Sequence, residues 1–213
     1  MWETLSPPWQ AALEMAWEAY ISGTVPIGAV VADAHGNIVA RGRNRIHESN
    51  APEGQVHANE LAHAEINALL SLKLAYEDAR HAALYTTMEP CPLCMGAVYM
   101  SDVKAMHYAA RDPWAGSANL LGTTPYMSRK PFKAFAPDNP LLETALIALH
   151  TEWQLFLRKD KILESKFFDA FRAVHPRAVE RGIELHRSGE MEQIKMNSRS
   201  AEEFFTALLF RVQ

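Results

Sequence analysis

A chain of 213 residues can bury a full hydrophobic core without cross-links to hold it together. Apolar residues make up 48% of it and charged residues 22%, with a net charge of −4, a composition typical of folded globular proteins that excludes a disordered chain. No stretch approaches about 18 uninterrupted apolar residues, and the N-terminus has no basic segment followed by an apolar run. We therefore expect a soluble, cytoplasmic protein with no membrane partner.

The first part of the chain predicts a helix followed by a hairpin. Ser6 stands before two prolines at a typical helix start, and apolar residues at helical spacing continue this helix to Gly23. Residues 27–32 and 38–43 predict two strands joined by a tight turn around Gly36. A polar loop of roughly twenty residues follows, longer than most loops in compact domains, which indicates a functional segment or an insertion.

Helices and strands alternate through the middle of the chain. In chain order, the predicted elements are helix 61–76, strand 83–88, a helix from about 91 to 101, strand 103–109, a weak strand at 131–136 and a helix capped by Asp138 or Asn139. This alternation predicts an α/β fold with helices on both faces of a sheet.

Beyond residue 158 the pattern is helical only. The segments there are 160–174, 176–188 and a helix beginning at Ser200, where Glu203 completes a capping box. We therefore expect a main domain over residues 1–158 and a helical C-terminal extension over residues 159–213.

Two short motifs, H-x-E and P-C-x-x-C, carry the chemistry. Cys91 and Cys94 are the two cysteines of the chain, which excludes a disulfide framework and favours a metal or redox site. Three positions apart at a helix start, they share a face where the helix dipole favours thiolates. His63, at the start of another helix, can add an imidazole, so the set predicts one zinc ion with an open fourth position for water. Glu65 points in a different direction and can take that water's proton.

This arrangement is the signature of zinc-dependent nucleobase deaminases. Several blocks resemble the tRNA adenosine deaminase and guanine deaminase branch of the cytidine/deoxycytidylate deaminase superfamily: VPIGAVV at 25–31, GRN at 42–44, HAEINAL at 63–69, ALYTTMEPCPLCMGAVYMS at 83–101 and YAARD at 108–112. The resemblance covers roughly residues 8–158. It implies a three-layer α/β/α cytidine-deaminase-like fold with a five-stranded mixed sheet, and a homodimer.

The resemblance also implies an activity and its residues. It makes His63, Cys91 and Cys94 the ligands of one Zn²⁺ per chain, with Glu65 as the catalytic proton shuttle. It also implies that Asn44 and Asp112 contact the substrate. The implied reaction is the hydrolytic deamination of an amino-bearing nucleobase or nucleoside, with purines such as guanine or adenine favoured and ammonia released. The long loop before the zinc histidine and the helices after residue 158 depart from this branch.

Other interpretations of the same residues stay open. A C-x-x-C pair after a strand, taken alone, equally fits a thioredoxin-like redox pair. Asn44 after a strand and Asp112 before a proline are also typical turn or cap residues. A deaminase fold with zinc could serve as a non-catalytic interaction module, but such a module needs no carboxylate at Glu65.

The distribution of charge bears on the substrate class. A protein that binds tRNA should present a basic face, because phosphate contacts dominate nucleic-acid affinity. Residues from 158 onward hold eleven Lys/Arg against nine Asp/Glu, and the rest of the chain holds ten against sixteen. Arg41, Arg43 and Arg45 alternate at a strand end and could supply one phosphate contact. We therefore favour a small nucleobase or nucleoside, with tRNA adenosine-to-inosine deamination as the alternative.

Overall fold

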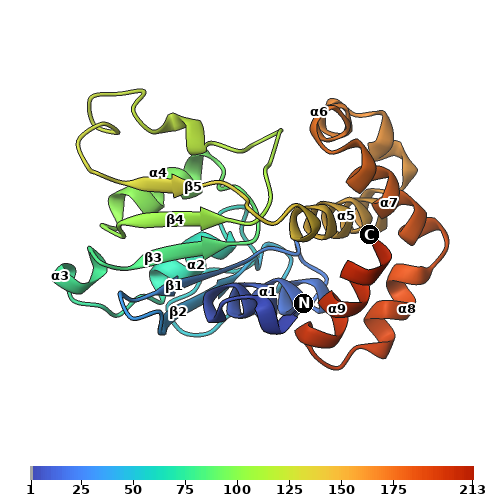
Figure 1. The fold of residues 1–213 in the computed structure, drawn as a ribbon, viewed down its shortest axis with the longest axis horizontal. Coiled ribbons are helices and arrows are strands. Elements are labelled where there is room, and N and C mark those ends of the chain that lie inside the picture. The colour runs from blue at the N-terminus through green and yellow to red at the C-terminus, as the bar shows by residue number, and fades with distance from the viewer. Residues whose placement is uncertain (1) are drawn as a thin grey trace.

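The computed structural model describes residues 2–213, which are built around a five-stranded sheet (Figure 1). Its strands are β1 Gly28–Ala32, β2 Ile38–Arg43, β3 Ala83–Thr86, β4 Ala105–Tyr108 and β5 Lys133–Phe135, in the order β2-β1-β3-β4-β5. β1 pairs antiparallel with β2 and β3, whereas β3 with β4 and β4 with β5 are parallel. The predicted mixed sheet of five strands is confirmed.

Helices cover both faces of this sheet. They are α1 Pro7–Ile21, α2 Ala64–Leu70, α3 Tyr76–Ala79, α4 Pro92–Met100, α5 Pro140–Arg158, α6 Lys166–Val174, α7 Pro176–Arg187, α8 Glu190–Asn197 and α9 Ala201–Arg211, with 3-10 turns at Trp2–Thr4, Ala118–Leu120 and Asp160–Glu164. Successive strand residues point to opposite faces. Val30 of β1 accordingly packs against Ala12 of α1, and its neighbour Ala29 packs against Ala64 of α2. With α4 beside α2 on the second face, the three-layer α/β/α fold is confirmed.

The helix predicted over residues 61–76 is shorter than its sequence pattern indicates. α2 begins only after His63, whose extended backbone (φ −74°, ψ 155°) ends the preceding turn, and it stops at Leu70. Leu72 and Leu74 continue the apolar pattern but pack outside any helix, against the core beneath the sheet. A separate short helix, α3, then precedes β3.

The C-terminal residues form a bundle of helices around α5, to the side of the sheet (Figure 1). This bundle shares a core with α1, because Trp17 of α1 stacks on Phe204 of α9 with ring centroids 4.6 Å apart. The helix α8 was not predicted, since its polar sequence buries only Met191. The predicted division at residue 158 stays a prediction. Within residues 2–213 no helix is long and apolar enough to cross a bilayer.

His150 is buried within this bundle, and its burial predicts that the stability of the folded protein depends on pH. It is buried in α5 among Phe167 and Phe171, and Gln154 Nε2 lies 3.2 Å from its Nε2. Burial lowers the pKa of His150 to about 4, although the nearby Asp112 carboxylate opposes this shift. An unfolded histidine has a pKa of about 6.5.

Between these two pKa values the unfolded chain binds a proton at His150 that the folded chain does not. The free energy of unfolding is therefore expected to fall as the pH drops from about 6.5 to about 4, by about 1.4 kcal/mol per unit and about 3 kcal/mol in total. Urea denaturation at several pH values measures this slope, and His150→Gln should flatten it. A His150→Gln protein with the wild-type slope would assign the acid sensitivity to other groups.

Candidate metal centre and substrate cavity

His63, Cys91 and Cys94 come together at the N-termini of α2 and α4. His63 and Cys91 are the residues directly before these helices, both with extended backbone, and Cys94 lies in the first turn of α4. α2 and α4 pack against each other, so the two sequence motifs meet. The unpaired N–H groups of a helix N-terminus stabilise anionic side chains such as thiolates.

The three side chains have the spacing that a tetrahedral zinc ion requires. His63 Nδ1 lies 3.3 Å from Cys94 Sγ and 3.5 Å from Cys91 Sγ, and all three ligand atoms lie within 4.8 Å of one another. Bonds of about 2.3 Å to sulfur and about 2.0 Å to nitrogen would place these two kinds of ligand about 3.5 Å apart around the ion. The residues therefore fit zinc, and three protein ligands would leave the fourth position of a tetrahedral ion to water or substrate.

Hydrogen bonds between these groups already favour a thiolate. The hydrogen bond from Cys94 lowers the pKa of Cys91, and the bond to His63 adds to that effect. The same bond between the cysteines, together with burial, raises the pKa of Cys94. The hydrogen bond to Cys91 also raises the pKa of His63. Since zinc is ligated by the thiolate form of cysteine, the local electrostatics suit Cys91 to this role.

Glu65 is buried in the first turn of α2, beside the three ligands. Its Oε2 lies 3.4 Å from Cys94 Sγ, and its Oε1 accepts a hydrogen bond of 3.1 Å from Thr86 Oγ1 of β3. Burial raises the pKa of Glu65, and a backbone hydrogen bond and the nearby His63 oppose this rise. A raised pKa makes a carboxylate a stronger base, which suits Glu65 to accept a proton and pass it on.

A cavity of about 140 Å³ opens beside Glu65. His63, Cys91 and both predicted substrate contacts, Asn44 and Asp112, line it. Its remaining walls are largely apolar, as in most sites for small ring compounds. The structure thus brings the sequence-predicted residues to one place, with Cys94 buried next to the cavity.

Asn44 is held through its amide oxygen. Oδ1 accepts a hydrogen bond of 2.7 Å from Thr24 Oγ1 and one of 3.1 Å from the backbone N–H of Ile46. Among residues 2–213, none accepts a hydrogen bond from Asn44 Nδ2. The side chain is 3% exposed, so its amide hydrogens are available only to a group inside the cavity.

Asp112 has the turn role that its sequence position also allows. Its Oδ1 accepts hydrogen bonds of 2.9 Å from the backbone N–H groups of Trp114 and Ala115. Its second oxygen, Oδ2, makes no hydrogen bond within the described part of the chain. One carboxylate oxygen therefore holds the turn while the other is free to accept from a ligand.

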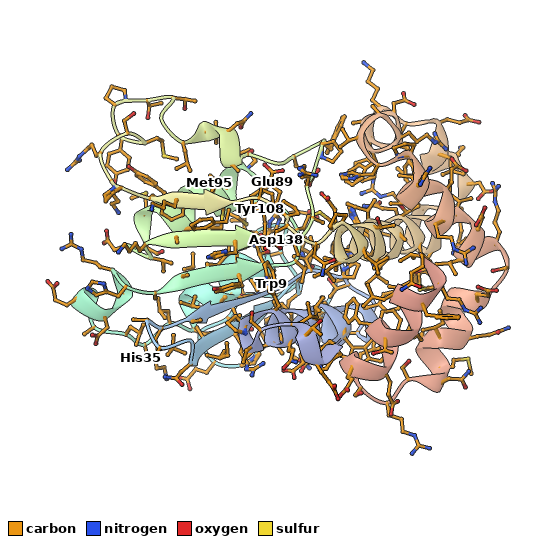
Figure 2. The ribbon with its side chains drawn as sticks, in the orientation of Figure 1. Trp9, His35, Glu89, Met95, Tyr108 and Asp138 are labelled. Atoms are coloured by element: carbon orange, nitrogen blue, oxygen red, sulfur yellow. The ribbon has the colours of Figure 1, made fainter. Side chains whose placement is uncertain are left out.

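Glu89 is a cavity residue that the sequence analysis missed. It lies near Tyr108 at the carboxyl end of β4 (Figure 2), and its backbone N–H donates to Ala110 O. Its carboxylate accepts hydrogen bonds of 3.2 Å from the backbone N–H groups of Asp112 and Ala118. Burial raises its pKa. The one signal in the sequence is its position directly before the P-C-x-x-C motif, which does not reveal these distant partners.

Comparison with known proteins identifies the family. Residues 5–110 match the family model described as the cytidine and deoxycytidylate deaminase zinc-binding region. The chain belongs to this deaminase family. The matched region holds His63, Glu65, Cys91 and Cys94, whereas Asp112 and the C-terminal helices lie beyond it.

Curated relatives of this chain include a tRNA-specific adenosine deaminase and a guanine deaminase. The chain is 35% identical to a tRNA-specific adenosine deaminase of Haemophilus influenzae over 108 residues. This match covers 50% of this chain and 58% of the relative. The chain is also 38% identical to a guanine deaminase of Bacillus subtilis over 97 residues. That match covers 45% of this chain and 56% of the relative. The chain thus spans a little over half the length of these relatives.

Solved structures show the same fold. The protein NE0047 in complex with 2,6-diaminopurine aligns with a TM-score of 0.53 and 25% identity, over 70% of this chain and 82% of that one. A structure from a study of A-to-I editing by tRNA:A34 deaminases aligns with a TM-score of 0.50 and 29% identity, over 61% of this chain and 95% of that one. The deaminase fold is therefore shared.

Proposed function

We propose that this protein is a zinc-dependent hydrolytic deaminase that converts an amino-bearing nucleobase or nucleoside to its oxo product and releases ammonia. The observation that carries this proposal is the placement of Glu65. A buried carboxylate lies against the metal ligands, 3.4 Å from Cys94 Sγ, and opens onto a cavity fit for a small ring. A site that only held a structural metal would not need such a group.

The chain's own residues divide the chemistry between them. A zinc ion held by His63, Cys91 and Cys94 would supply a Lewis acid that activates water for attack on the amino-bearing ring carbon. Thr86 fixes Glu65 Oε1 by donating a hydrogen bond, so Oε2 stays directed at the metal centre. Glu65 takes one proton of the attacking water at Oε2 and passes it to the ring nitrogen. It then takes the proton of the new hydroxyl group on the ring carbon and passes it to the amino group, which leaves as ammonia.

Asn44 and the cavity wall orient the substrate. The Asn44 amide donates to a carbonyl or ring nitrogen of the base, or to a sugar oxygen, since its Oδ1 is already bonded to Thr24 and Ile46. The free Oδ2 of Asp112 accepts from an amino or ring N–H group. The cavity therefore offers a base one hydrogen-bond donor, the Asn44 amide, and one acceptor, the Asp112 carboxylate. The homodimer that the resemblance implies stays a prediction.

The surface charges support a small substrate. Each arginine near the end of β2 is engaged within the protein: Arg41 pairs with Glu14 at 2.8 Å, and Arg43 pairs with Glu48 at 2.8 Å. Arg45 bonds to Glu48 and Gln55 and is 8% exposed. Because each of these cations already has a carboxylate partner, binding a tRNA phosphate would require it to share or break that ion pair.

A tRNA is the second candidate substrate, on the strength of the curated relative named a tRNA-specific adenosine deaminase and the aligned structure from the study of tRNA deaminases. The deciding experiment measures ammonia release from guanine, adenine, cytosine, their nucleosides and a tRNA anticodon stem-loop.

We expect turnover of a base or nucleoside that changes little between low and moderate salt, because few counterions are released on binding. Turnover confined to the stem-loop, with a steep loss of activity as salt rises, would favour the tRNA. A protein that deaminates none of these compounds would contradict the proposed function.

A further inference from the structure

The 109–117 segment, which follows β4, forms one side of the cavity and is tied to the metal centre. Asp112 from this segment lines the cavity. Glu89 accepts hydrogen bonds of 3.2 Å from the backbone N–H groups of Asp112 and Ala118. Glu89 stands two residues before Cys91. Glu89 therefore links the segment to the chain that carries the zinc ligand Cys91.

The C-terminal helices hold the same segment from the opposite side, through Arg111. Glu143 of α5 accepts a hydrogen bond of 3.0 Å from the Arg111 backbone N–H and bonds of 3.1 and 3.0 Å from its Nη1. His175, between α6 and α7, donates from Nε2 to the Arg111 carbonyl oxygen at 3.2 Å. The carbonyl oxygen of the residue before Asp112 is thus bonded to the extension beyond residue 158, and its N–H group to α5.

An aromatic contact adds a third attachment. Trp114, which is 56% exposed, meets Phe167 of α6 edge to face with ring centroids 6.0 Å apart. Phe167 in turn packs on Phe171 at 4.7 Å and on the buried His150 at 5.8 Å. The largely exposed Trp114 ring is therefore in contact with an aromatic residue that packs on the core of the C-terminal bundle.

We propose that the C-terminal helices take part in substrate binding, with His175 and Phe167 as positioning residues that hold the 109–117 segment, and with it Asp112, at the cavity. The inference rests on the proposed function, and it gives the residues beyond 158 a role in that site. Neither positioning residue is among those that line the cavity. Their effect passes through the backbone of the 109–117 segment, so it should change how well substrate binds more than how fast bound substrate reacts.

The test compares His175→Ala, His175→Gln and Phe167→Ala in the full-length protein. As a matched control, Arg181→Ala removes a hydrogen bond of 2.6 Å from α7 to the Arg211 carbonyl oxygen, away from the segment. Hydrogen exchange of the Trp114 and Ala115 amides reports on the segment directly, and KM and kcat are measured with the base or nucleoside that the wild-type protein turns over best.

We expect exchange of these two amides to quicken and KM to rise by up to about tenfold in His175→Ala and Phe167→Ala, the loss typical of one hydrogen bond or aromatic contact, with kcat within about twofold and zinc content unchanged. His175→Gln, which keeps a donor, should recover most of the wild-type KM, and Arg181→Ala should match the wild type. If either alanine variant is too unstable to assay, the other carries the test.

Unchanged exchange, or a wild-type KM in the alanine variants, would overturn the inference while leaving the deaminase proposal intact. An equal rise of KM in Arg181→Ala would also overturn it, since the effect would then be general. A wild-type protein that deaminates nothing in the panel would instead contradict the proposed function itself, and with it this role for the helices.

Discussion

Glu65→Gln is expected to lower kcat by a factor of about 10² to 10⁴, the range typical of general acid–base residues, while the protein keeps its zinc. Glutamine preserves the size of the side chain and can still accept the hydrogen bond from Thr86, which lies 3.1 Å from Oε1. It cannot take up a proton. The metal should remain bound, because the three grouped ligands are His63, Cys91 and Cys94, and Glu65 only lies beside them.

His63→Ala should fail in a different way. It removes one of three protein ligands, so zinc content and deamination are expected to fall together. Some stability should be lost as well, since metal binding is coupled to folding. Zinc per chain by elemental analysis, measured beside ammonia release, separates the two variants.

A matched control for the charge change is Glu53→Gln, which lies exposed in the loop after β2 and should behave as the wild type. A Glu65→Gln protein that retains both its zinc and near-normal deamination would show that Glu65 is not the proton shuttle. A wild-type protein without bound metal, or an active form with a reversible disulfide between Cys91 and Cys94, would favour the redox interpretation of the C-x-x-C pair.

The metal centre could be predicted from the sequence because its chemistry depends on side-chain types at short spacing. Cys91 and Cys94 are close in the chain, and His63 and Glu65 are two residues apart near the start of another helix. The turn role of Asp112 was foreseeable for the same reason, since its bonds to Trp114 and Ala115 are local. Local spacing was enough for these residues.

Features that depend on distant partners could not be predicted in this way. The hydrogen bonds that Glu89 accepts from Asp112 and Ala118 join residues more than twenty positions apart, and no periodicity signals them. The early end of α2 has the same origin, because apolar residues beyond Leu70 are drawn to a tertiary core and not to a helical face. The course of the C-terminal helices around α5 likewise follows from packing between segments.

Gly42→Ala is expected to lower the free energy of unfolding by more than about 3 kcal/mol and to reduce zinc binding at the same time. Gly42 in β2 faces α2, and a methyl group there would lie 2.1 Å from Ala68 N and 2.4 Å from Ala64 O. Both neighbours are backbone atoms of the helix, so no side chain can rotate away. The whole of α2 would have to move off the sheet.

The consequence reaches the metal centre because α2 carries it. His63 directly precedes this helix and Glu65 lies in its first turn, so a displaced α2 withdraws one zinc ligand and the proton shuttle together. Gly96→Ala is the matched control: it lies inside α4, and a methyl group there meets no atom within 4 Å. Alanine at that position should stabilise the helix by about 0.5–1 kcal/mol. Urea denaturation midpoints and zinc content of the two variants test the packing directly. A Gly42→Ala protein with the wild-type midpoint and a full complement of zinc would mean that α2 does not lie against β2 as closely as the structure places it.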